Sequence, residues 1–412
     1  MKILIINYYF EPVIGAHAYR WSQIAKEWAG RGHEVEVISG RFEKKSIYDN
    51  DGVLIKRIGI VRTEGTESDS EYSDPFKVNS FLFLTKFKVR YLLKRVYRKI
   101  YWPDGLWLWL PSLLLELFKR KSKKYDLIIS YSPTFSAHLG ALFFKKISCY
   151  RSAWIADYGD PFSLSSTMPP NNLKFYAHLN NCVESAVIKS CQIVSMTNKD
   201  TLIAYKNKFK KSSDKIICIP HLVDIDKFYS KQKLKPKINK NFIRFIYVGG
   251  FHKDIRDPSF MLSFFCLLEK AGFNFTLDLY GPLNGFEIES KGPIRHHGII
   301  SRSRAIEVVQ SADCLVNVEN INCFMTPSKL VEYVATGKPI LNFIQDNCSE
   351  LLLEYENSGF VFNARDCGVV SDFMRWIEAV GSLNTHESVF NYVGDNSLVN
   401  ISEKYLELID EI

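Results

Sequence analysis

A regular alternation of short apolar runs with longer amphipathic segments, which occurs twice along the 412 residues, constrains the fold most strongly. Alternating strand and helix patterns are typical of parallel sheets whose strands are joined by crossover helices. The runs predicted to form strands are 2–10, 34–40, 125–131, 153–159, 192–197 and 215–220 in the first half, and 243–250, 275–281, 313–319, 339–344 and 360–363 in the second. The segments predicted to form helices are 16–32, 134–146, 173–190, 257–270, 303–312, 326–337, 349–359 and the C-terminal residues.

The two series of strands predict an α/β protein with two Rossmann-like domains that face one another across a cleft. We expect an N-terminal domain over 1–220, a C-terminal domain over 221–395 and a terminal helix over 396–412 that returns to the N-terminal domain. The length supports this division because 412 residues exceed what one core ordinarily contains. Open α/β sheets bind ligands beyond the carboxyl ends of their strands, so the cleft is the expected ligand site.

The cysteines and the apolar runs indicate a cytoplasmic protein. Nine cysteines are scattered without a CxxC pair, which favours reduced thiols in the cytosol. No apolar run reaches the ~18 residues that cross a bilayer. The chain starts directly with the strand pattern MKILIINYYF, so we expect no secretory signal.

The positive net charge of +8 comes from one segment, residues 81–124, which holds twelve Lys or Arg and two acidic residues. The same segment contains several Trp and Tyr residues and the apolar run LWLWLPSLLLELF over 106–118. Basic residues beside Trp and Leu suit the headgroup layer of an anionic membrane. The alternative is a solvated basic helix next to an internal core helix, and nucleic acid is a third possibility that we do not expect.

A lysine at the start of a predicted helix indicates an anion site. Lys329 lies in the first turn of the helix predicted over 326–337, where the helix dipole disfavours a cation, and a bound anion would remove the conflict. Arg256, just before the helix predicted over 257–270, is a second cation that suits a diphosphate. Glu332 lies one turn deeper on the same face, where a carboxylate can accept hydrogen bonds from a ribose diol. The alternative is an ordinary surface ion pair between Lys329 and Glu332.

Six segments resemble, in the same order, those of retaining glycosyltransferases with the GT-B fold, of the large family-four or group 1 type. Each segment alone is a weak signal, but the six together extend over nearly the whole chain. They are NYYFEPVIGAHAYRWSQIAKEWAGRGHEVEVIS (7–39), WIADYGDPF (154–162), IPHLVDIDKF (219–228), YVGGFHKDIRDP (247–258), HHGIISRSRAIEVVQSADCLV (296–316) and TPSKLVEYVATGKPIL (326–341).

The resemblance implies roles for individual residues. It implies that Arg256 and Lys329 neutralise the donor diphosphate and that Glu332 holds the ribose. Either Asp157 or Asp160 matches the acidic position near the reacting sugar. The other residues that it implies for substrate binding are Gly15, Gly249, Gly250, His297 and Ser328. Two adjacent histidines on a strand point to opposite faces, so we expect one imidazole of His296-His297 near the donor phosphates and the other outside.

Departures from the family pattern concern the donor sugar. Phe324 stands where the group often has a second glutamate, so the donor can be a deoxy or amino sugar, or Glu319 or Asn322 can substitute. Gly159 stands where arginine is frequent. The pair Asp224–Asp226 resembles a metal motif but fits the interdomain turn, and such enzymes need no metal or other cofactor because the two cations stabilise the departing diphosphate.

The resulting functional prediction is a retaining glycosyltransferase that moves a sugar from a nucleotide diphosphate, with UDP as the expected nucleotide, to a membrane-linked glycan acceptor in cell-surface polysaccharide or lipopolysaccharide synthesis. Its expected location is the inner face of the cytoplasmic membrane. One alternative is a non-hydrolysing nucleotide-sugar 2-epimerase, which needs acid and base groups but no lipid-facing segment. The other is a non-catalytic GT-B-like subunit that only associates with a membrane.

Overall fold

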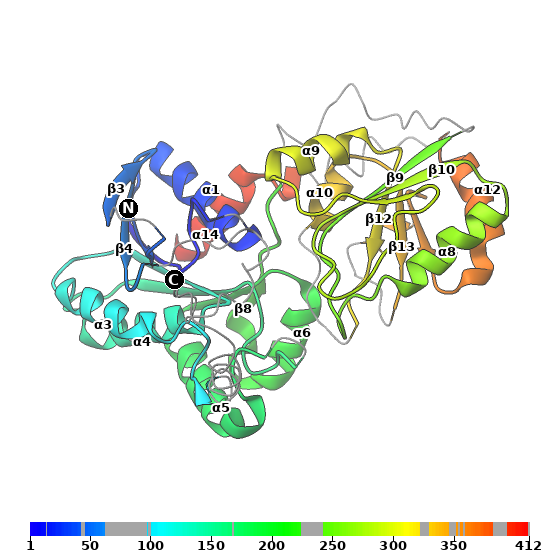
Figure 1. The fold of residues 1–412 in the computed structure, drawn as a ribbon. Coiled ribbons are helices and arrows are strands. Elements are labelled where there is room, and N and C mark those ends of the chain that lie inside the picture. Colours follow the sequence, from blue (N-terminus) through cyan, green and yellow to red (C-terminus); the bar gives the residue numbers. More distant parts are fainter. Residues whose placement is uncertain are drawn as a thin grey trace, which may run out of the picture. The chain divides into compact units, whose positions relative to one another are not determined.

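The chain forms two compact units, one of Met1–Pro220 with Ser402–Ile412 and the other of His221–Ile401. The computed structural model describes residues 1–13, 15–42, 46–61, 97, 100–166, 169–223, 242–321, 329–345, 352, 355–356, 359–381 and 394–410. Both units are α/β structures in which helices pack on sheets of mainly parallel strands (Figure 1).

The first unit is built on an eight-stranded sheet in the order β3-β4-β2-β1-β5-β6-β7-β8. Neighbouring strands are parallel, except that β3 and β4 are antiparallel. Its strands are β1 (Lys2–Ile6), β2 (Glu34–Gly40), β3 (Ile47–Asn50), β4 (Val53–Ile58), β5 (Leu127–Ser132), β6 (Ala153–Tyr158), β7 (Ile193–Met196) and β8 (Ile216–Cys218). Its helices are α1 (Ala16–Gly30), α3 (Trp109–Lys119), α4 (Phe135–Ile147), α5 (Leu173–Ser190), α6 (Lys199–Lys208) and the 3-10 turn η2 (Lys210–Lys215).

Helices cover both faces of this sheet, as a parallel sheet requires. Helices α3, α4 and α5 lie on one face and α1 on the other (Figure 1). The apolar faces of α3 and α4 meet the sheet in one core, where Leu113, Phe135 and Trp154 are fully buried. The strands β5 and β6 therefore hold their carboxyl ends, Ser132 and Tyr158, in fixed positions at one edge.

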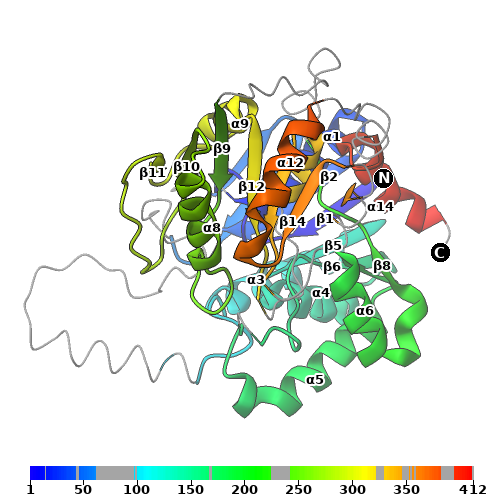
Figure 2. The same ribbon diagram turned by 90° about the vertical axis from the view of Figure 1, so that its right-hand side faces the viewer.

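The second unit is built on a six-stranded parallel sheet in the order β11-β10-β9-β12-β13-β14. Its strands are β9 (Ile243–Val248), β10 (Phe275–Tyr280), β11 (Ile294–His296), β12 (Cys314–Val318), β13 (Ile340–Phe343) and β14 (Val361–Ala364). Its helices are α8 (Ser259–Lys270), α9 (Arg302–Ser311), α10 (Lys329–Ala335), α12 (Val370–Val380) and the 3-10 turn η3 (Cys367–Val369). Helices α9 and α10 pack on one face and α8 and α12 on the other (Figures 1 and 2).

The last helix, α14 (Leu398–Asp410), supplies the C-terminal part of the first unit from Ser402 onward. Tyr405 is fully buried there, with its ring centroid 5.2 Å from that of Trp21 in α1. The Arg20 guanidinium donates a 2.7 Å hydrogen bond to the Tyr405 hydroxyl. An amphipathic terminal helix thus completes the core of a unit whose other elements lie at the start of the chain.

The elements that the pattern analysis did not predict include the hairpin of β3 and β4 and the helices α6 and α12. The hairpin turns through Asp51 and Gly52, whose φ values are 54° and 78°. An Asp-Gly pair between two alternating runs is a strong signal for such a turn, so the hairpin was predictable from the sequence. The helix predicted over 349–359 lies mostly outside the described residues.

The apolar part of the basic segment forms α3, whose Trp109, Leu113 and Leu117 are buried in the core. This part of the segment is therefore an internal core helix, as the alternative interpretation had it. Arg120 is also buried and pairs with Glu36 and Glu116, so at least one of the twelve basic residues stabilises the fold. Residues 81–96, 98 and 99 lie outside the described residues.

Candidate functional site

Lys329 is the first described residue of α10, and its ammonium group is buried without a hydrogen-bond partner in the described part of the chain. The residue as a whole keeps some exposure, but the Nζ atom does not. Nζ lies 3.7 Å from the ring centroid of Tyr247 and 5.8 Å from that of Tyr333. Two aromatic rings attract a cation but replace little of its lost hydration. This site therefore holds a cation whose interactions are incomplete.

The electrostatics of Lys329 reflect this burial. Desolvation lowers the pKa of Lys329 well below 10.5, and the positive charge of Arg256 lowers it further, whereas Glu319 acts in the opposite direction. Lys329 does not form the alternative surface ion pair with Glu332, because its Nζ atom is buried without a hydrogen-bond partner among the described residues and lies against the Tyr247 ring.

Arg256 is the second predicted cation, and the structure brings it into the electrostatic neighbourhood of Lys329. Its Nε and Nη2 atoms donate hydrogen bonds of 3.1 and 2.7 Å to the Asn320 amide oxygen, and Nη1 donates to the Gly250 carbonyl at 3.3 Å. These acceptors are neutral, so they orient the guanidinium without cancelling its charge. Two cations thus share one region at the end of β9.

Two glycines, Gly249 beside Lys329 and Gly281 beside Gly249, stand where a larger residue would not fit. Gly249 has a φ of 153°, and a Cβ there would lie 2.7 Å from Lys329 Nζ. A Cβ on Gly281, at the end of β10, would collide with the Gly249 backbone. Only glycine leaves room here, and the same property lets a ligand approach the backbone closely. The Val248 N–H donates a 2.9 Å hydrogen bond to the Tyr333 hydroxyl, which fixes α10 against the end of β9.

Glu332, predicted to hold a ribose, pairs with Arg302 at the start of α9. The pair joins α10 to α9 and keeps the Glu332 carboxylate half-buried on this side of the sheet. Ser328, Phe324, Asn322 and Asp224–Asp226 lie outside the described residues.

The two aspartates that match the acidic position differ completely in environment. Asp157 in β6 has no exposed surface, and it accepts hydrogen bonds from Trp21 Nε1 at 3.0 Å and from Ser195 Oγ at 2.7 Å. Burial raises the pKa of Asp157, while the nearby Arg20 acts to lower it. A carboxylate enclosed in this way has no surface for a sugar, so Asp157 has a structural role in the described conformation.

Asp160 lies beyond the end of β6 and remains accessible. Its Oδ2 atom is 3.7 Å from Nε2 of His17, whose Nδ1 shares a 2.6 Å hydrogen bond with the Tyr131 hydroxyl. Gly15, directly before α1, has open space where a Cβ would project. The first unit therefore presents a partly exposed carboxylate, an imidazole and an open glycine at the carboxyl end of its sheet.

Tyr131 also explains why glycine occupies position 159. A Cβ on Gly159 would collide with the Tyr131 hydroxyl and the Ser132 carbonyl. The arginine that is frequent at this position in the resembled family would not fit beside Tyr131 in this chain.

The two adjacent histidines, His296 and His297, contact different parts of the second unit. His296 Nε2 hydrogen-bonds the Gly281 carbonyl at 2.8 Å, next to Gly249. His297 instead pairs with Asp278 at 2.7 Å and stacks on Tyr280. His296 is thus the imidazole beside Gly249 and Gly281, and the donor-binding role of His297 stays a prediction.

Sequence reasoning did not find Tyr247, Asn320 and Arg302, which position Lys329, Arg256 and Glu332. Their only sequence signal is that each stands at the end of a strand or the start of a helix on the same sheet edge. Among the described residues, no group of three or more His, Cys, Asp or Glu side chains could hold a metal ion. No helix in the same ranges is both long enough and apolar enough to cross a membrane.

Comparison with solved structures shows which fold this is, although no protein-family model and no curated protein matches the sequence. Sucrose-phosphate synthase from Thermosynechococcus elongatus is similar with a TM-score of 0.61 and 12% identity, over 100% of this chain and 98% of that one. HepE from Anabaena, in complex with UDP and glucose, gives a TM-score of 0.59 and 14% identity over 100% of both chains. The lipopolysaccharide outer core galactosyltransferase WaaB, in its apo form, gives 0.56 and 14% over 100% and 99%.

These proteins are GT-B glycosyltransferases, and each matches the chain from end to end. Identities of this size report on the fold alone. Over its whole length, the chain therefore has the GT-B fold of the glycosyltransferases.

Proposed function

We propose that this chain is a retaining glycosyltransferase that uses a nucleotide-diphosphate sugar, with UDP as the nucleotide. The observation that carries the proposal is the buried ammonium of Lys329, which has no hydrogen-bond partner among the described residues and lies beside Arg256 and Gly249. A diphosphate supplies the missing counter-charge, and the glycine backbone allows it to approach. The solved structures of HepE contain UDP, which supports the choice of nucleotide.

The chemistry follows from these two cations. The bond between the anomeric carbon and the β-phosphate oxygen breaks, and the acceptor hydroxyl forms a new bond to the same carbon on the same face. The departing diphosphate gains negative charge, which Lys329 and Arg256 stabilise, and it accepts the proton of the acceptor hydroxyl. We assign Glu332 to the ribose and Asp160, in the first unit, to the reacting sugar. No metal or other cofactor is required in this scheme.

The proposed acceptor is a lipid-linked glycan at the cytoplasmic face of a membrane, in polysaccharide or lipopolysaccharide synthesis. Leu115 and Phe118 on α3 keep about half of their surface exposed, at 58% and 49%. Lys119, Lys121 and Lys123 follow closely in the sequence and are exposed, and Lys121 Nζ lies over the Phe118 ring. Apolar side chains flanked by lysines suit an anionic lipid surface.

Thermal shifts with UDP, GDP, TDP and CDP test the nucleotide site. A ligand at 100 times its Kd stabilises the native state by about 2.7 kcal/mol, so one nucleotide should raise the unfolding temperature by several degrees. Glu332→Ala should remove most of this shift, whereas Glu378→Ala, an exposed glutamate on α12, should leave it unchanged.

Other results of the nucleotide measurements would each point to a different function. If no nucleotide stabilises the wild-type protein, the proposal is wrong and a non-catalytic membrane-associated subunit replaces it. If a nucleotide sugar binds and is epimerised at C2 without transfer, the protein is an epimerase. An unchanged shift in Glu332→Ala would contradict the assignment of the ribose.

A further inference from the structure

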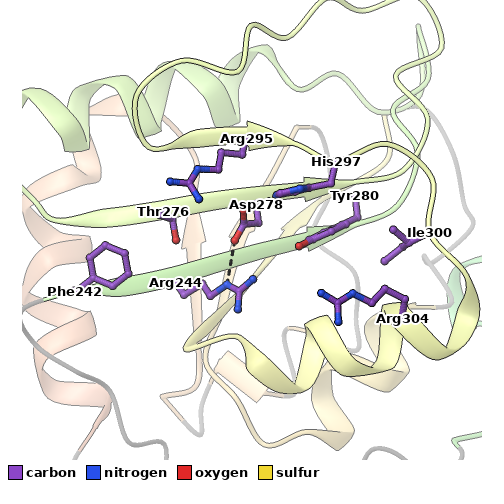
Figure 3. Close-up of a pocket in the computed structure, with 9 residues that line it drawn as sticks. All are labelled: Phe242, Arg244, Thr276, Asp278, Tyr280, Arg295, His297, Ile300 and Arg304. Carbon is purple, nitrogen blue, oxygen red and sulfur yellow. Dashed lines mark hydrogen bonds and ion pairs between the residues drawn. The ribbon is translucent and has the colours of Figure 1, made fainter.

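A pocket of about 590 Å³ lies on the second unit, and none of Lys329, Arg256 and Glu332 lines it. It is formed on the side of the sheet that faces α9, over the edge strand β11 and its neighbour β10 (Figure 3). Its volume is in the range of pockets that take small molecules. The residues that line it are Phe242, Arg244, Thr276, Asp278, Tyr280, Arg295, His297, Ile300 and Arg304.

The register of the strands explains why these side chains meet. Arg244 in β9 pairs with Thr276 in β10, and Asp278 in β10 pairs with Arg295 in β11. Paired residues lie on the same face of a sheet, and residues two apart along one strand do as well. Arg304 reaches the same space from the first turns of α9 (Figure 3). Three arginines therefore converge from three different elements.

Among the described residues that line the pocket, Asp278 is the only carboxylate, and it already pairs with two other lining residues. Asp278 is buried, and its Oδ2 accepts a 3.0 Å hydrogen bond from Arg244 Nε while its Oδ1 is 2.7 Å from His297 Nε2. Asp278 thus anchors Arg244 and His297 but leaves Arg295 and Arg304 uncompensated within the pocket. With His297 neutral, the lining residues carry a net charge of two positive units.

Arg295 and Arg304 keep N–H donors that a ligand can use. No hydrogen bond or ion pair of the Arg295 side chain is found with any residue that the structure describes. Arg304 donates from Nη1 to Glu307 at 2.7 Å in an exposed pair, a type of interaction worth little, and the rest of its guanidinium remains available. Planar guanidinium groups match the oxygens of phosphate particularly well.

The remaining surface is flat and partly apolar. The rings of Tyr280 and His297 are stacked with their centroids 4.6 Å apart and an interplanar angle of 13°. Ile300 and Phe242 extend this surface at opposite ends of the pocket (Figure 3). A ligand with a phosphate and a compact organic part would satisfy both the arginines and this surface.

We propose that this arginine pocket is a second binding site, separate from the nucleotide site, for a small phosphate-bearing molecule. The proposal does not depend on the proposed glycosyltransferase activity, because Arg244, Arg295 and Arg304, which carry it, are not among the residues assigned to the donor. The phosphate can belong to the free inorganic ion or to a phosphate ester such as a sugar phosphate, and the experiment distinguishes these sources.

Calorimetric titration of the full chain with inorganic phosphate and with glucose 6-phosphate, at constant ionic strength, tests the pocket. We expect both to bind, and the ester to bind more tightly if the aromatic surface contributes. Arg295→Gln combined with Arg304→Gln should weaken binding of both probes by at least about tenfold, because two charge-assisted contacts are lost. The matched control is Arg375→Gln on α12, an exposed arginine with a similar i,i+3 pair to Asp372, which should have no effect.

Lys329→Met separates the two sites. We expect it to abolish UDP binding but to leave phosphate binding unchanged. Loss of phosphate binding in Lys329→Met would show that the ion occupies the nucleotide site and would overturn the proposal. Unchanged binding in the double arginine variant, or an equal loss in Arg375→Gln, would overturn it as well. The single variant Arg295→Gln, at an exposed position, gives the same test if the double variant does not fold.

Discussion

At the scale of single residues, the unusual state of Lys329 connects stability with function. A buried ammonium that faces two aromatic rings and a neighbouring guanidinium is unfavourable until an anion arrives. Functional sites often keep such unfavourable groups because the ligand relieves them. Lys329 should therefore lower the free energy of unfolding of the ligand-free protein and raise that of the complex with an anion.

Lys329→Met should stabilise the ligand-free protein by roughly 1–4 kcal/mol, because an apolar side chain of similar length replaces a buried charge. The stabilisation expected from Lys329→Met depends on pH. Since the pKa of Lys329 is lowered in the folded state, the unfolded chain binds more protons between that pKa and 10.5, and stability of the wild type rises with pH over this window. The stabilisation by Lys329→Met should thus be largest at low pH and should disappear above pH 10.5.

Urea unfolding of wild type and Lys329→Met across this pH range measures the difference directly. The exposed Lys270→Met, at the end of α8, is the control for removing a lysine from the same unit. A destabilising effect of Lys329→Met at low pH would show that the ammonium is well compensated in the free protein.

At the scale of elements, α3 combines a buried and an exposed apolar side. Its buried side packs in the core with α4, while Leu115 and Phe118 face solvent. Lys121 Nζ lies 4.5 Å from the ring centroid of Phe118, so basic and aromatic groups are adjacent on this surface. An internal core helix and a lipid-facing surface are therefore compatible in one element.

Replacing both Leu115 and Phe118 with serine should weaken binding to vesicles of anionic phospholipid by about tenfold or more, because two apolar side chains no longer enter the interface. Binding of the wild type should fall with added salt, because exposed lysines contribute. Cosedimentation with vesicles is the measurement, and Leu267→Ser, at an exposed leucine on α8, is the control. Equal binding of the double variant and the wild type would exclude this surface.

At the scale of the whole molecule, the C-terminal residues complete the first unit. Tyr405 packs against Trp21 and Trp28, and its hydroxyl accepts from Arg20. Arg20 in turn lies 3.6 Å from Asp157, so the end of the chain is linked to the buried carboxylate of β6. This connection explains why Asp157 is enclosed while Asp160 is not.

Tyr405→Ala should lower the free energy of unfolding of the first unit by about 3–5 kcal/mol, since a large buried aromatic ring is lost. Tyr405→Phe keeps the ring and should cost only about 1–2 kcal/mol for the hydrogen bond from Arg20. Chemical denaturation of both variants, with the exposed Glu407→Ala as control, gives the comparison. Similar values for Ala and Phe would mean that the hydroxyl, and not the ring, is the stabilising part.

Much of the fold was predictable because the strands of parallel sheets are continuous apolar runs. The predicted strands over 34–40 and 153–159 correspond closely to β2 and β6, and the helix predicted over 173–190 is α5. The sequence singled out Lys329, Arg256 and the two glycines after β9, Gly249 and Gly250, for a related reason. Charged residues and glycine at the ends of strands and starts of helices have few structural explanations other than a ligand.

The sequence by itself determined which segments are strands and helices and that they form two α/β units, because hydrophobic period is a local property. From the placement of charge it also predicted that Lys329 and Arg256 bind a ligand, and this assignment stays a prediction. Only the tertiary structure decided that Asp157 is buried while Asp160 keeps some exposed surface, which imidazole contacts Gly281, and that Lys329 lies against Tyr247. It also brought Arg244, Arg295 and Arg304 into one pocket. These outcomes depend on contacts between residues far apart in the chain, and burial sets their electrostatics.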